Sequence, residues 1–156
     1  MISAETKAKI ESLKAKYPSA RSALGPALDL AQRELGYLSP QAMREVAGLV
    51  GAPAVEAASF ASFYTMFNRQ PVGKHLIQVC TNISCSLLGA DHIVRLLSEK
   101  LGIRAGETTP DGRFTLMTVE CLGSCGTAPM MQVDDTYYEN LTVERVEEIL
   151  AELSRD

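Results

Sequence analysis

The segment VECLGSCGTAPMMQVDDTYYENLT (Val119–Thr142) contains two of the four cysteines in the chain, Cys121 and Cys125. The other two stand at positions 80 and 85 of the segment HLIQVCTNISC (His75–Cys85). The spacing is therefore C-x4-C, a gap of 35 residues, and C-x3-C. No other cysteine occurs in the sequence, so any sulfur chemistry belongs to these two pairs.

Each cysteine pair begins where an expected β-strand ends. The stretches His75–Cys80 and Arg113–Glu120 are rich in apolar and β-branched residues, a composition typical of strands. Both are followed by small and polar residues that favour a loop. If the two strands are neighbours in one sheet, their ends bring all four sulfur atoms to one edge.

The rest of the second half alternates helix and strand signals. Apolar residues at helical spacing predict a helix over Ala90–Leu101. The sequence Pro110–Gly112 predicts a turn. Pro129–Val133 and Thr136–Tyr138 are predicted to form a hairpin, and Thr142 is predicted to cap a last helix. The order of strand, helix, strand, hairpin and helix indicates a compact α/β layer.

The first 67 residues are predicted to be helical. Apolar residues recur at helical spacing in four stretches, Ile10–Tyr17, Leu24–Leu35, Met43–Val50 and Phe60–Phe67. The polar segment Asn68–Lys74 then contains Pro71 and Gly73, which favour a domain boundary. We therefore predict an α+β protein, with a four-helix bundle in residues 1–70 and an α/β domain in residues 71–156.

The composition is that of an ordinary soluble protein. The 156 residues are 46% hydrophobic and 22% charged, with a net charge of −4. Lysine and arginine are scattered, so we expect no nucleic-acid partner. No stretch approaches the ~20 apolar residues that span a bilayer, and the charged N-terminus does not have the pattern of a signal peptide. We expect a cytoplasmic chain without membrane insertion.

Four converging thiolates in a cytoplasmic protein favour a metal centre over disulfides. A thioredoxin-type dithiol needs C-x2-C, which is absent here, and zinc sites favour short knuckles. A Rieske centre would need two histidine ligands, and His75 and His92 are not placed for that role. A 2Fe–2S cluster carries two cysteines on each iron and tolerates these loops better. The spacing favours this cluster, and leaves zinc, free core thiols and thiol redox chemistry as alternatives.

Residues beside the cysteines are candidates for tuning a cluster's reduction potential. Gly123 and Gly126 leave the backbone free to approach sulfur, and Ser84 and Ser124 offer donors to it, although such residues are also common in plain turns. Glu120 would place a carboxylate within ~6–10 Å of the iron, lowering the potential by roughly 70–100 mV. The alternative is that Glu120 points to solvent or pairs with a partner's cation. We predict a low-potential centre.

Two local features carry further expectations. Cys85 is predicted to lie at the start of a helix over residues 87–101, where the positive end of the helix dipole favours a thiolate. The fourth helical stretch carries an aromatic group, Phe60, Phe63, Tyr64 and Phe67. We expect this group to pack in the helical core, with a role as a partner anchor as the alternative.

With these residues identified, the sequence resembles the thioredoxin-like 2Fe–2S subunits of respiratory complex I (NADH:quinone oxidoreductase), also called the 24-kilodalton or E subunits. The resemblance covers nearly the whole chain and is strongest over Ser62–Cys85, Gly106–Leu116 and Val119–Thr142. It implies a thioredoxin-like fold for the α/β domain. It also implies that the four cluster ligands are Cys80, Cys85, Cys121 and Cys125.

The resemblance further implies an electron-transfer role. Family members bind a flavoprotein subunit that holds FMN, the NADH site and a 4Fe–4S cluster, and exchange one electron with its FMN. The present chain has no G-x-G-x-x-G motif after a strand and no further cysteines. We therefore expect no catalytic residues here and no oxidation of NADH by this chain alone. The helical part would dock the chain onto its partner. The chain as a whole would lie in the peripheral arm of the complex, on the cytoplasmic face of the inner membrane.

Related functions remain as alternatives at this point. Sister proteins on the same fold serve NAD-dependent formate dehydrogenases and the diaphorase modules of hydrogenases. A zinc-stabilised interaction module is an alternative of a different class. The resemblance also draws attention to Ala128-Pro129, which stands where thioredoxin-like folds often carry a cis-proline, and the sequence leaves its isomer open.

Overall fold

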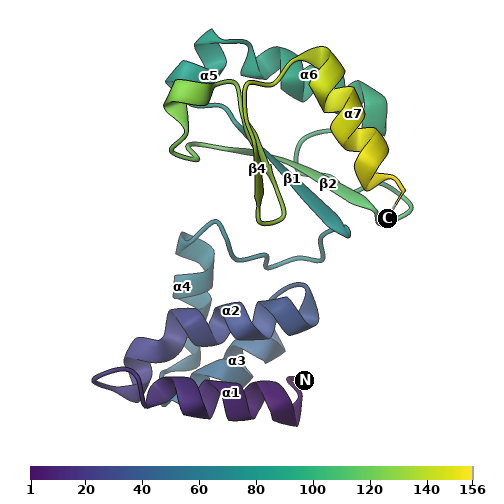
Figure 1. The fold of residues 1–156 in the computed structure, drawn as a ribbon. Coiled ribbons are helices and arrows are strands. Elements are labelled where there is room, and N and C mark those ends of the chain that lie inside the picture. The colour runs from purple at the N-terminus through teal and green to yellow at the C-terminus, as the bar shows by residue number, and fades with distance from the viewer. Residues whose placement is uncertain (156) are drawn as a thin grey trace. The chain divides into compact units, whose positions relative to one another are not determined.

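The chain divides into two compact units, Met1–Pro71 and Val72–Asp156 (Figure 1). This division is seen in a computed structural model that describes residues 1–155. The first unit is helical, whereas the second combines helices with a single sheet. The α+β class predicted from the sequence is therefore confirmed.

Four α-helices and one 3-10 turn make up the first unit. Their bounds are α1 (Ala4–Lys14), η1 (Ala20–Ala23), α2 (Leu24–Leu35), α3 (Pro40–Val50) and α4 (Ala54–Phe63). The helix ends follow from local sequence. Ser39 caps α3 by accepting a hydrogen bond from the Ala42 N–H at 3.1 Å, and Gly51 ends the helix in the left-handed region at φ 68°.

The four helices share one apolar core, because each places a buried stripe toward the others. Its fully buried members include Ile10 of α1, Leu28 of α2, Val46 of α3 and Ala57 of α4. The helices do not, however, form a regular antiparallel array, since α3 and α4 are bent by 117° at the break between them. The number of helices and their common core agree with the expected four-helix bundle, but the bundle geometry itself is not confirmed.

The same two helices bear on membrane insertion. Among the described residues, no single helix has both the length and the apolar content to cross a bilayer. The α3 and α4 helices reach that composition only when they are taken together across their bend.

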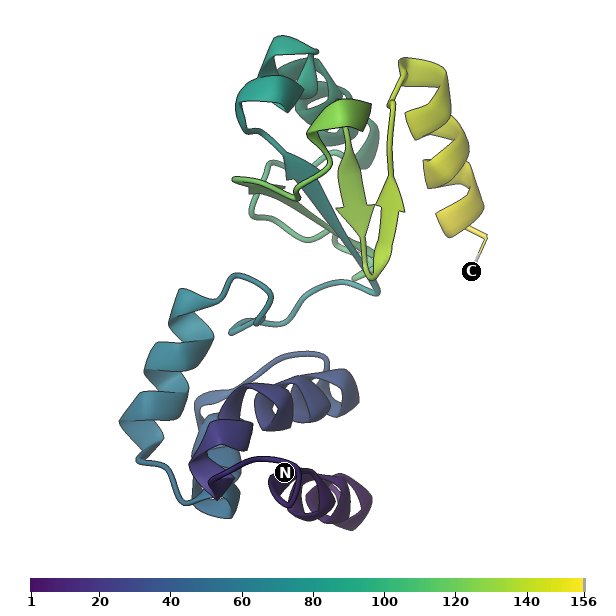
Figure 2. The same cartoon turned by 60° about the vertical axis from the view of Figure 1, so that its left-hand side comes forward.

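The second unit places three α-helices and a short 3-10 turn around a four-stranded sheet (Figures 1 and 2). Their bounds are β1 (His75–Cys80), α5 (Ile83–Leu87), α6 (Ala90–Leu101), β2 (Phe114–Val119), η2 (Cys125–Thr127), β3 (Met131–Val133), β4 (Thr136–Tyr138) and α7 (Val143–Leu153). The predicted strands, hairpin and two longer helices of this half are confirmed to within three residues at their ends.

The sheet order is β2-β1-β3-β4. The β1 and β2 strands are parallel, from His75 opposite Phe114 to Cys80 opposite Val119, with α6 in the connection between them. The β3 strand pairs antiparallel with β1, and β4 pairs antiparallel with β3. Since parallel strands end at the same edge, the loops after β1 and β2 begin side by side.

The apolar core of this unit lies between the sheet and the helices α6 and α7. Leu97 of α6 and Ile149 of α7 are fully buried against strand residues such as Ile77 and Leu116. Each such side chain contributes roughly 1.5–3 kcal/mol by leaving water. This packing holds the strand ends in place for the loops that follow them.

The start of β1 is tied to the β3–β4 turn. The Asp134 carboxylate accepts the Leu76 N–H at 2.9 Å, and its other oxygen lies 2.9 Å from His75 Nδ1. Asp134 itself has φ 54°, a conformation that aspartate tolerates in a tight turn. The hairpin expected around this residue is therefore anchored to the neighbouring strand.

The aromatic group of the first unit is split between core and surface. Phe67 is buried and Phe60 is half-buried, but Phe63 is 78% exposed and Tyr64 is 44% exposed. The expectation that all four pack in the core is wrong for Phe63 and Tyr64. The physical reason is that α4 ends at Phe63, with Tyr64 in an extended conformation at φ −88° and ψ 113°, so the helical spacing stops there.

Candidate metal centre

The four cysteines lie at one end of the sheet on four different local structures. Cys80 ends β1, Cys85 lies within α5, Cys121 stands in the loop after β2, and Cys125 begins η2. All four are free thiols. Cys80 and Cys85 are only 4% and 2% exposed, whereas Cys121 and Cys125 are exposed to solvent. The site therefore consists of a buried pair and an exposed pair.

The loop between β2 and β3 brings the exposed pair to the end of β1. The Thr81 N–H donates to the Val119 carbonyl at 2.9 Å, and the Cys80 N–H donates to the Met130 carbonyl at 3.2 Å. The Cys80 sulfur also lies 3.8 Å from the Glu120 carbonyl oxygen. In Figures 1 and 2 this loop, with η2, lies beside α5. The expectation that both cysteine pairs meet at one edge is confirmed.

Cys85 does not begin the long helix, as the sequence led us to expect. It lies in the middle of α5, a separate five-residue helix. Asn82 caps this helix by accepting the Ile83 N–H at 2.7 Å, and Gly89 at φ 99° separates it from α6. The dipole argument for Cys85 is therefore wrong, because one short turn has no macrodipole comparable to that of α6.

Backbone donors distinguish the thiols of the buried pair. Burial alone would raise the pKa of Cys80, but the N–H groups of Asn82 and Leu122 and the Cys85 thiol donate to its sulfur and hold that pKa below its usual value. Burial and the neighbouring Cys80 sulfur raise the pKa of Cys85, although the Met130 N–H partly offsets them.

These backbone groups were not found from the sequence. Asn82, Leu122 and Met130 each provide an N–H to a sulfur, and the Gly123 N–H donates to the Cys121 sulfur at 3.4 Å. Of the four, only Gly123 was predicted, because a missing side chain signals close approach of the backbone. Whether a backbone N–H donates to sulfur does not otherwise depend on residue type, so the other three donors could be recognised only from the fold.

The residues predicted to tune the reduction potential differ in exposure and in hydrogen bonding. Glu120 is exposed, and its negative charge opposes ionisation of Cys80. The Ser124 hydroxyl is engaged by the Glu139 carboxylate and by Thr127. Ser84 is half-buried in α5, and Gly126 has open space around it. Their influence on a reduction potential stays a prediction.

The donor set fits a 2Fe–2S cluster. Four thiols in two pairs supply two sulfur ligands to each of two irons, and the surrounding N–H groups offset negative charge on sulfur. Among residues 1–155, no three histidine, cysteine, aspartate or glutamate side chains are gathered around one point as ligands of a single ion.

The same loop contains the Ala128–Pro129 peptide bond, which is cis. The isomer that the sequence left open is thereby assigned. The bond lies between η2 and β3, next to Met130, which is fully buried beside the two buried cysteines.

Comparison with known proteins agrees with this architecture. A model of the thioredoxin-like [2Fe-2S] ferredoxin family matches residues 10–154. The chain belongs to this family. The match spans both the helical unit and the sheet unit, and the four cysteines lie within the matched residues.

Family members with similar sequences belong to respiratory enzymes. The chain is 48% identical to the E 2 subunit of NADH-quinone oxidoreductase from Rhizobium meliloti (strain 1021), over 90% of this chain and 84% of that protein. It is 49% identical to the E subunit of NADH-quinone oxidoreductase from Rickettsia bellii (strain RML369-C), over 90% of this chain and 86% of that protein. It is 50% identical to the mitochondrial NADH dehydrogenase [ubiquinone] flavoprotein 2 of Dictyostelium discoideum, over 88% of this chain and 57% of that longer protein.

The fold also occurs in a larger enzyme. A crystal structure of NAD+-reducing [NiFe]-hydrogenase in the air-oxidized state matches with a TM-score of 0.75 over 85% of this chain, at 23% sequence identity. The H2-reduced form of the same type of enzyme matches with a TM-score of 0.73 at 22% identity. This chain spans about a quarter of those hydrogenase chains, 23% and 22% respectively, and the likeness shows a shared fold.

Proposed function

We propose that this chain is an electron-transfer subunit of an NADH:quinone oxidoreductase, and that Cys80, Cys85, Cys121 and Cys125 hold its 2Fe–2S cluster. The observation that carries the proposal is the parallel register of β1 and β2, which sets Cys80 opposite Val119 and brings the two cysteine loops together. The near 48% identity to E subunits over most of their length supports this complex. The hydrogenase likeness, at 23% identity, supports a diaphorase role less strongly.

The residues of the chain prepare a site for one-electron transfer. When bound, the cluster supplies a carrier that takes up and releases a single electron. The buried pair, Cys80 and Cys85, provides a fixed base for it, and the exposed pair lies on the solvent side. The N–H groups around the sulfurs favour added negative charge, whereas the exposed carboxylate of Glu120 opposes it. The balance would leave a low-potential centre.

An apolar surface beside the cysteines suits a protein partner. Ile83, Leu87 and Leu88 on and after α5 are 72%, 81% and 59% exposed, next to buried Cys85. Residues 75–94 and 114–144 contain six acidic residues and no lysine or arginine. A partner with an apolar patch bordered by basic residues would complement this end of the unit.

We assign this surface to the flavoprotein that carries FMN and the NADH site, because an electron must cross the interface close to the cluster. The helical unit offers a second contact. The exposed side of α4 carries Val55 and Phe63, which are 72% and 78% exposed, and its single charged residue, Glu56, is paired with Arg21. Bound to the flavoprotein through these surfaces, the chain would belong to a peripheral arm on the cytoplasmic face of the inner membrane.

Anaerobic purification tests the proposal directly. We expect about two irons and two sulfides per chain, and an electron paramagnetic resonance signal that appears only after reduction by dithionite. About one zinc per chain with no sulfide and no signal would contradict the proposal and indicate a zinc-stabilised module. Reactive thiols without any metal would indicate a thiol oxidoreductase instead.

A further inference from the structure

Two side chains, one in β4 and one just after it, hold the cysteine loop. The Tyr137 hydroxyl donates to the Leu122 carbonyl at 2.8 Å, one residue after Cys121. The Glu139 carboxylate accepts hydrogen bonds from the hydroxyls of Ser124 and Thr127, which flank Cys125. Each exposed cysteine thus has a neighbour that is tied to the β4 strand or to the residues just after it.

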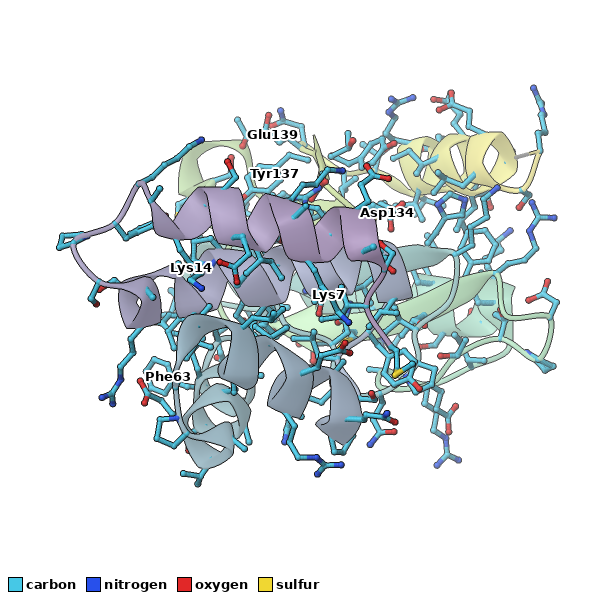
Figure 3. The ribbon with its side chains drawn as sticks, turned by 90° about the horizontal axis from the view of Figure 1, so that it is seen from below. Lys7, Lys14, Phe63, Asp134, Tyr137 and Glu139 are labelled. Carbon is cyan, nitrogen blue, oxygen red and sulfur yellow. The ribbon has the colours of Figure 1, made fainter. Side chains whose placement is uncertain are left out.

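Tyr137 lies within β4 (Thr136–Tyr138), and Glu139 follows the last residue of that strand. Successive residues of a strand point to opposite faces, so Tyr137 and Tyr138 lie on opposite sides of β4. Tyr138 packs against the core between the sheet and the helices. Figure 3 shows Tyr137 and Glu139 close together, with Asp134 farther along the hairpin. The hairpin therefore has a core side and a side that faces the cysteine loop.

The contact at Glu139 is a small network. The Thr127 hydroxyl lies 2.5 Å from the Glu139 carboxylate and 2.8 Å from the Ser124 hydroxyl. The backbone continues the attachment, since the Asn140 N–H donates to the Thr127 carbonyl at 2.8 Å. Hydrogen bonds to a carboxylate are stronger than those between neutral groups. This network is thus the firmer of the two attachments.

The two cysteine pairs differ in what restrains them. Cys80 and Cys85 are held by burial against Ala90 and Met130. Cys121 and Cys125 are exposed and lie outside strands and α-helices, so burial cannot restrain them. Their positions depend on hydrogen bonds to the loop. A loop free to move would let two of four ligands leave together.

We propose that Tyr137 and Glu139 are positioning residues that hold the Cys121–Thr127 loop in the conformation that binds the cluster. This inference rests on the proposed ligation by the four cysteines. Their hydrogen bonds go to the Leu122 carbonyl and to the Ser124 and Thr127 hydroxyls, and they act by limiting movement of the exposed pair. Removing either contact should let the cluster escape faster and broaden the range of its geometries, while the core on the other side of β4 stays intact.

The test compares cluster release in variants of the full chain. Purified, cluster-loaded protein is mixed with an iron chelator in excess, and the loss of visible absorbance gives a release rate. Tyr137→Phe removes only the hydroxyl, and we expect about fivefold faster release, the factor for one net hydrogen bond of ~1 kcal/mol. Glu139→Ala should accelerate release by at least about tenfold, with Glu139→Gln in between because its amide oxygen still accepts a hydrogen bond.

Matched controls separate positioning from general effects. Tyr138→Phe makes the same chemical change on the opposite side of the same strand. Glu99→Gln removes an exposed carboxylate on α6. Both should release the cluster at the wild-type rate. The spectrum of the reduced cluster is recorded for every variant, and we expect broadened lines in Tyr137→Phe and Glu139→Ala only.

The outcomes are distinct. Release rates and spectra of Tyr137→Phe and Glu139→Ala that equal those of the controls would overturn the positioning role. So would faster release that only parallels a fall in the midpoint of thermal unfolding, with an unchanged spectrum. A wild-type chain that holds no 2Fe–2S cluster would contradict the proposed function itself, before any variant is compared.

Discussion

Cys80 and Val119 stand directly opposite each other at the ends of the parallel strands β1 and β2. This pairing sets the first cysteine beside the start of the loop that contains the last two, although about forty residues separate them in the sequence. The β3 strand then returns along the other side of β1 and closes the loop over the end of that strand. The position of the candidate centre is thus set by the edge of the sheet at which β1 and β2 end.

Replacing any one of the four cysteines should prevent stable cluster binding. We expect Cys80→Ser, Cys85→Ser, Cys121→Ser and Cys125→Ser to lower bound iron from about two per chain to well below one, because in each variant one of the two irons would lose one of its two thiolates. Iron and acid-labile sulfide are measured after anaerobic purification. Ser12→Ala, exposed on α1, is the control. Full iron content in any of the four variants would remove that residue from the ligand set.

Glu120→Gln should raise the midpoint potential. Loss of a negative charge near the cluster favours the reduced, more negative state, and we expect a shift of about 30–90 mV. The lower end is included because the exposed side chain of Glu120 is screened by water and salt. A redox titration followed by electron paramagnetic resonance measures the shift, with Glu99→Gln as the remote control. Equal potentials in both variants would contradict the electrostatic role.

Leu87→Glu should weaken binding of the flavoprotein by about tenfold or more, because a charge would be buried in the contact. Leu87 is 81% exposed in the free chain, so the substitution should leave the midpoint of thermal unfolding unchanged. Binding of the purified flavoprotein is measured by titration calorimetry. Gln41→Glu adds the same charge on the exposed side of α3 and serves as the control. Undiminished affinity in Leu87→Glu would move the docking surface elsewhere.

Leu97→Ala should destabilise the sheet unit. Leu97 is fully buried between α6 and the strands, and truncation there costs about 2–5 kcal/mol of unfolding free energy through lost burial and a residual cavity. Chemical denaturation of the full chain measures the loss. Leu96→Ala, on the half-buried side of the same helix, should cost less. A smaller effect at Leu97 than at Leu96 would show that the core is misassigned.

Acid should loosen the attachment of α1 to α3. Hydrogen bonds from Lys7 and from the Ile2 N–H hold the pKa of Glu45 below its usual value of 4.5. A lowered folded-state pKa means that this stabilisation is present above pH 4.5 and is lost as the pH falls through the folded-state pKa. Glu45→Gln should therefore lower the midpoint of thermal unfolding at pH 7 by roughly 1–3 °C, and by less at pH 3 than at pH 7.

The comparison at two pH values is its own control, since any packing defect in Glu45→Gln would persist in acid. A difference from the wild type that is equal at pH 3 and pH 7 would contradict the ion-pair explanation. Lys7→Met should show the same pH dependence, because it removes the other partner of the 2.6 Å contact.

Most elements of the fold could be read from local pattern. The β1 strand was predicted with its observed bounds, His75–Cys80, and the last helix was predicted to start after its Thr142 cap, as observed. A cap signal is reliable because a side-chain acceptor is needed at that point of the backbone whatever the rest of the chain does. The α5 helix was missed because five residues show no helical periodicity.

The sequence by itself determined the four cysteines, their spacing after two strands, and the resemblance that named their chemistry. Only the tertiary structure decided that Cys80 and Cys85 are buried while Cys121 and Cys125 are exposed, and that Tyr137 and Glu139 reach back to their loop. The physical reason is that strand order and loop path set which distant residues meet. Hydrogen bonds across fifteen residues, such as that from Tyr137 to Leu122, leave no periodic signal in the chain.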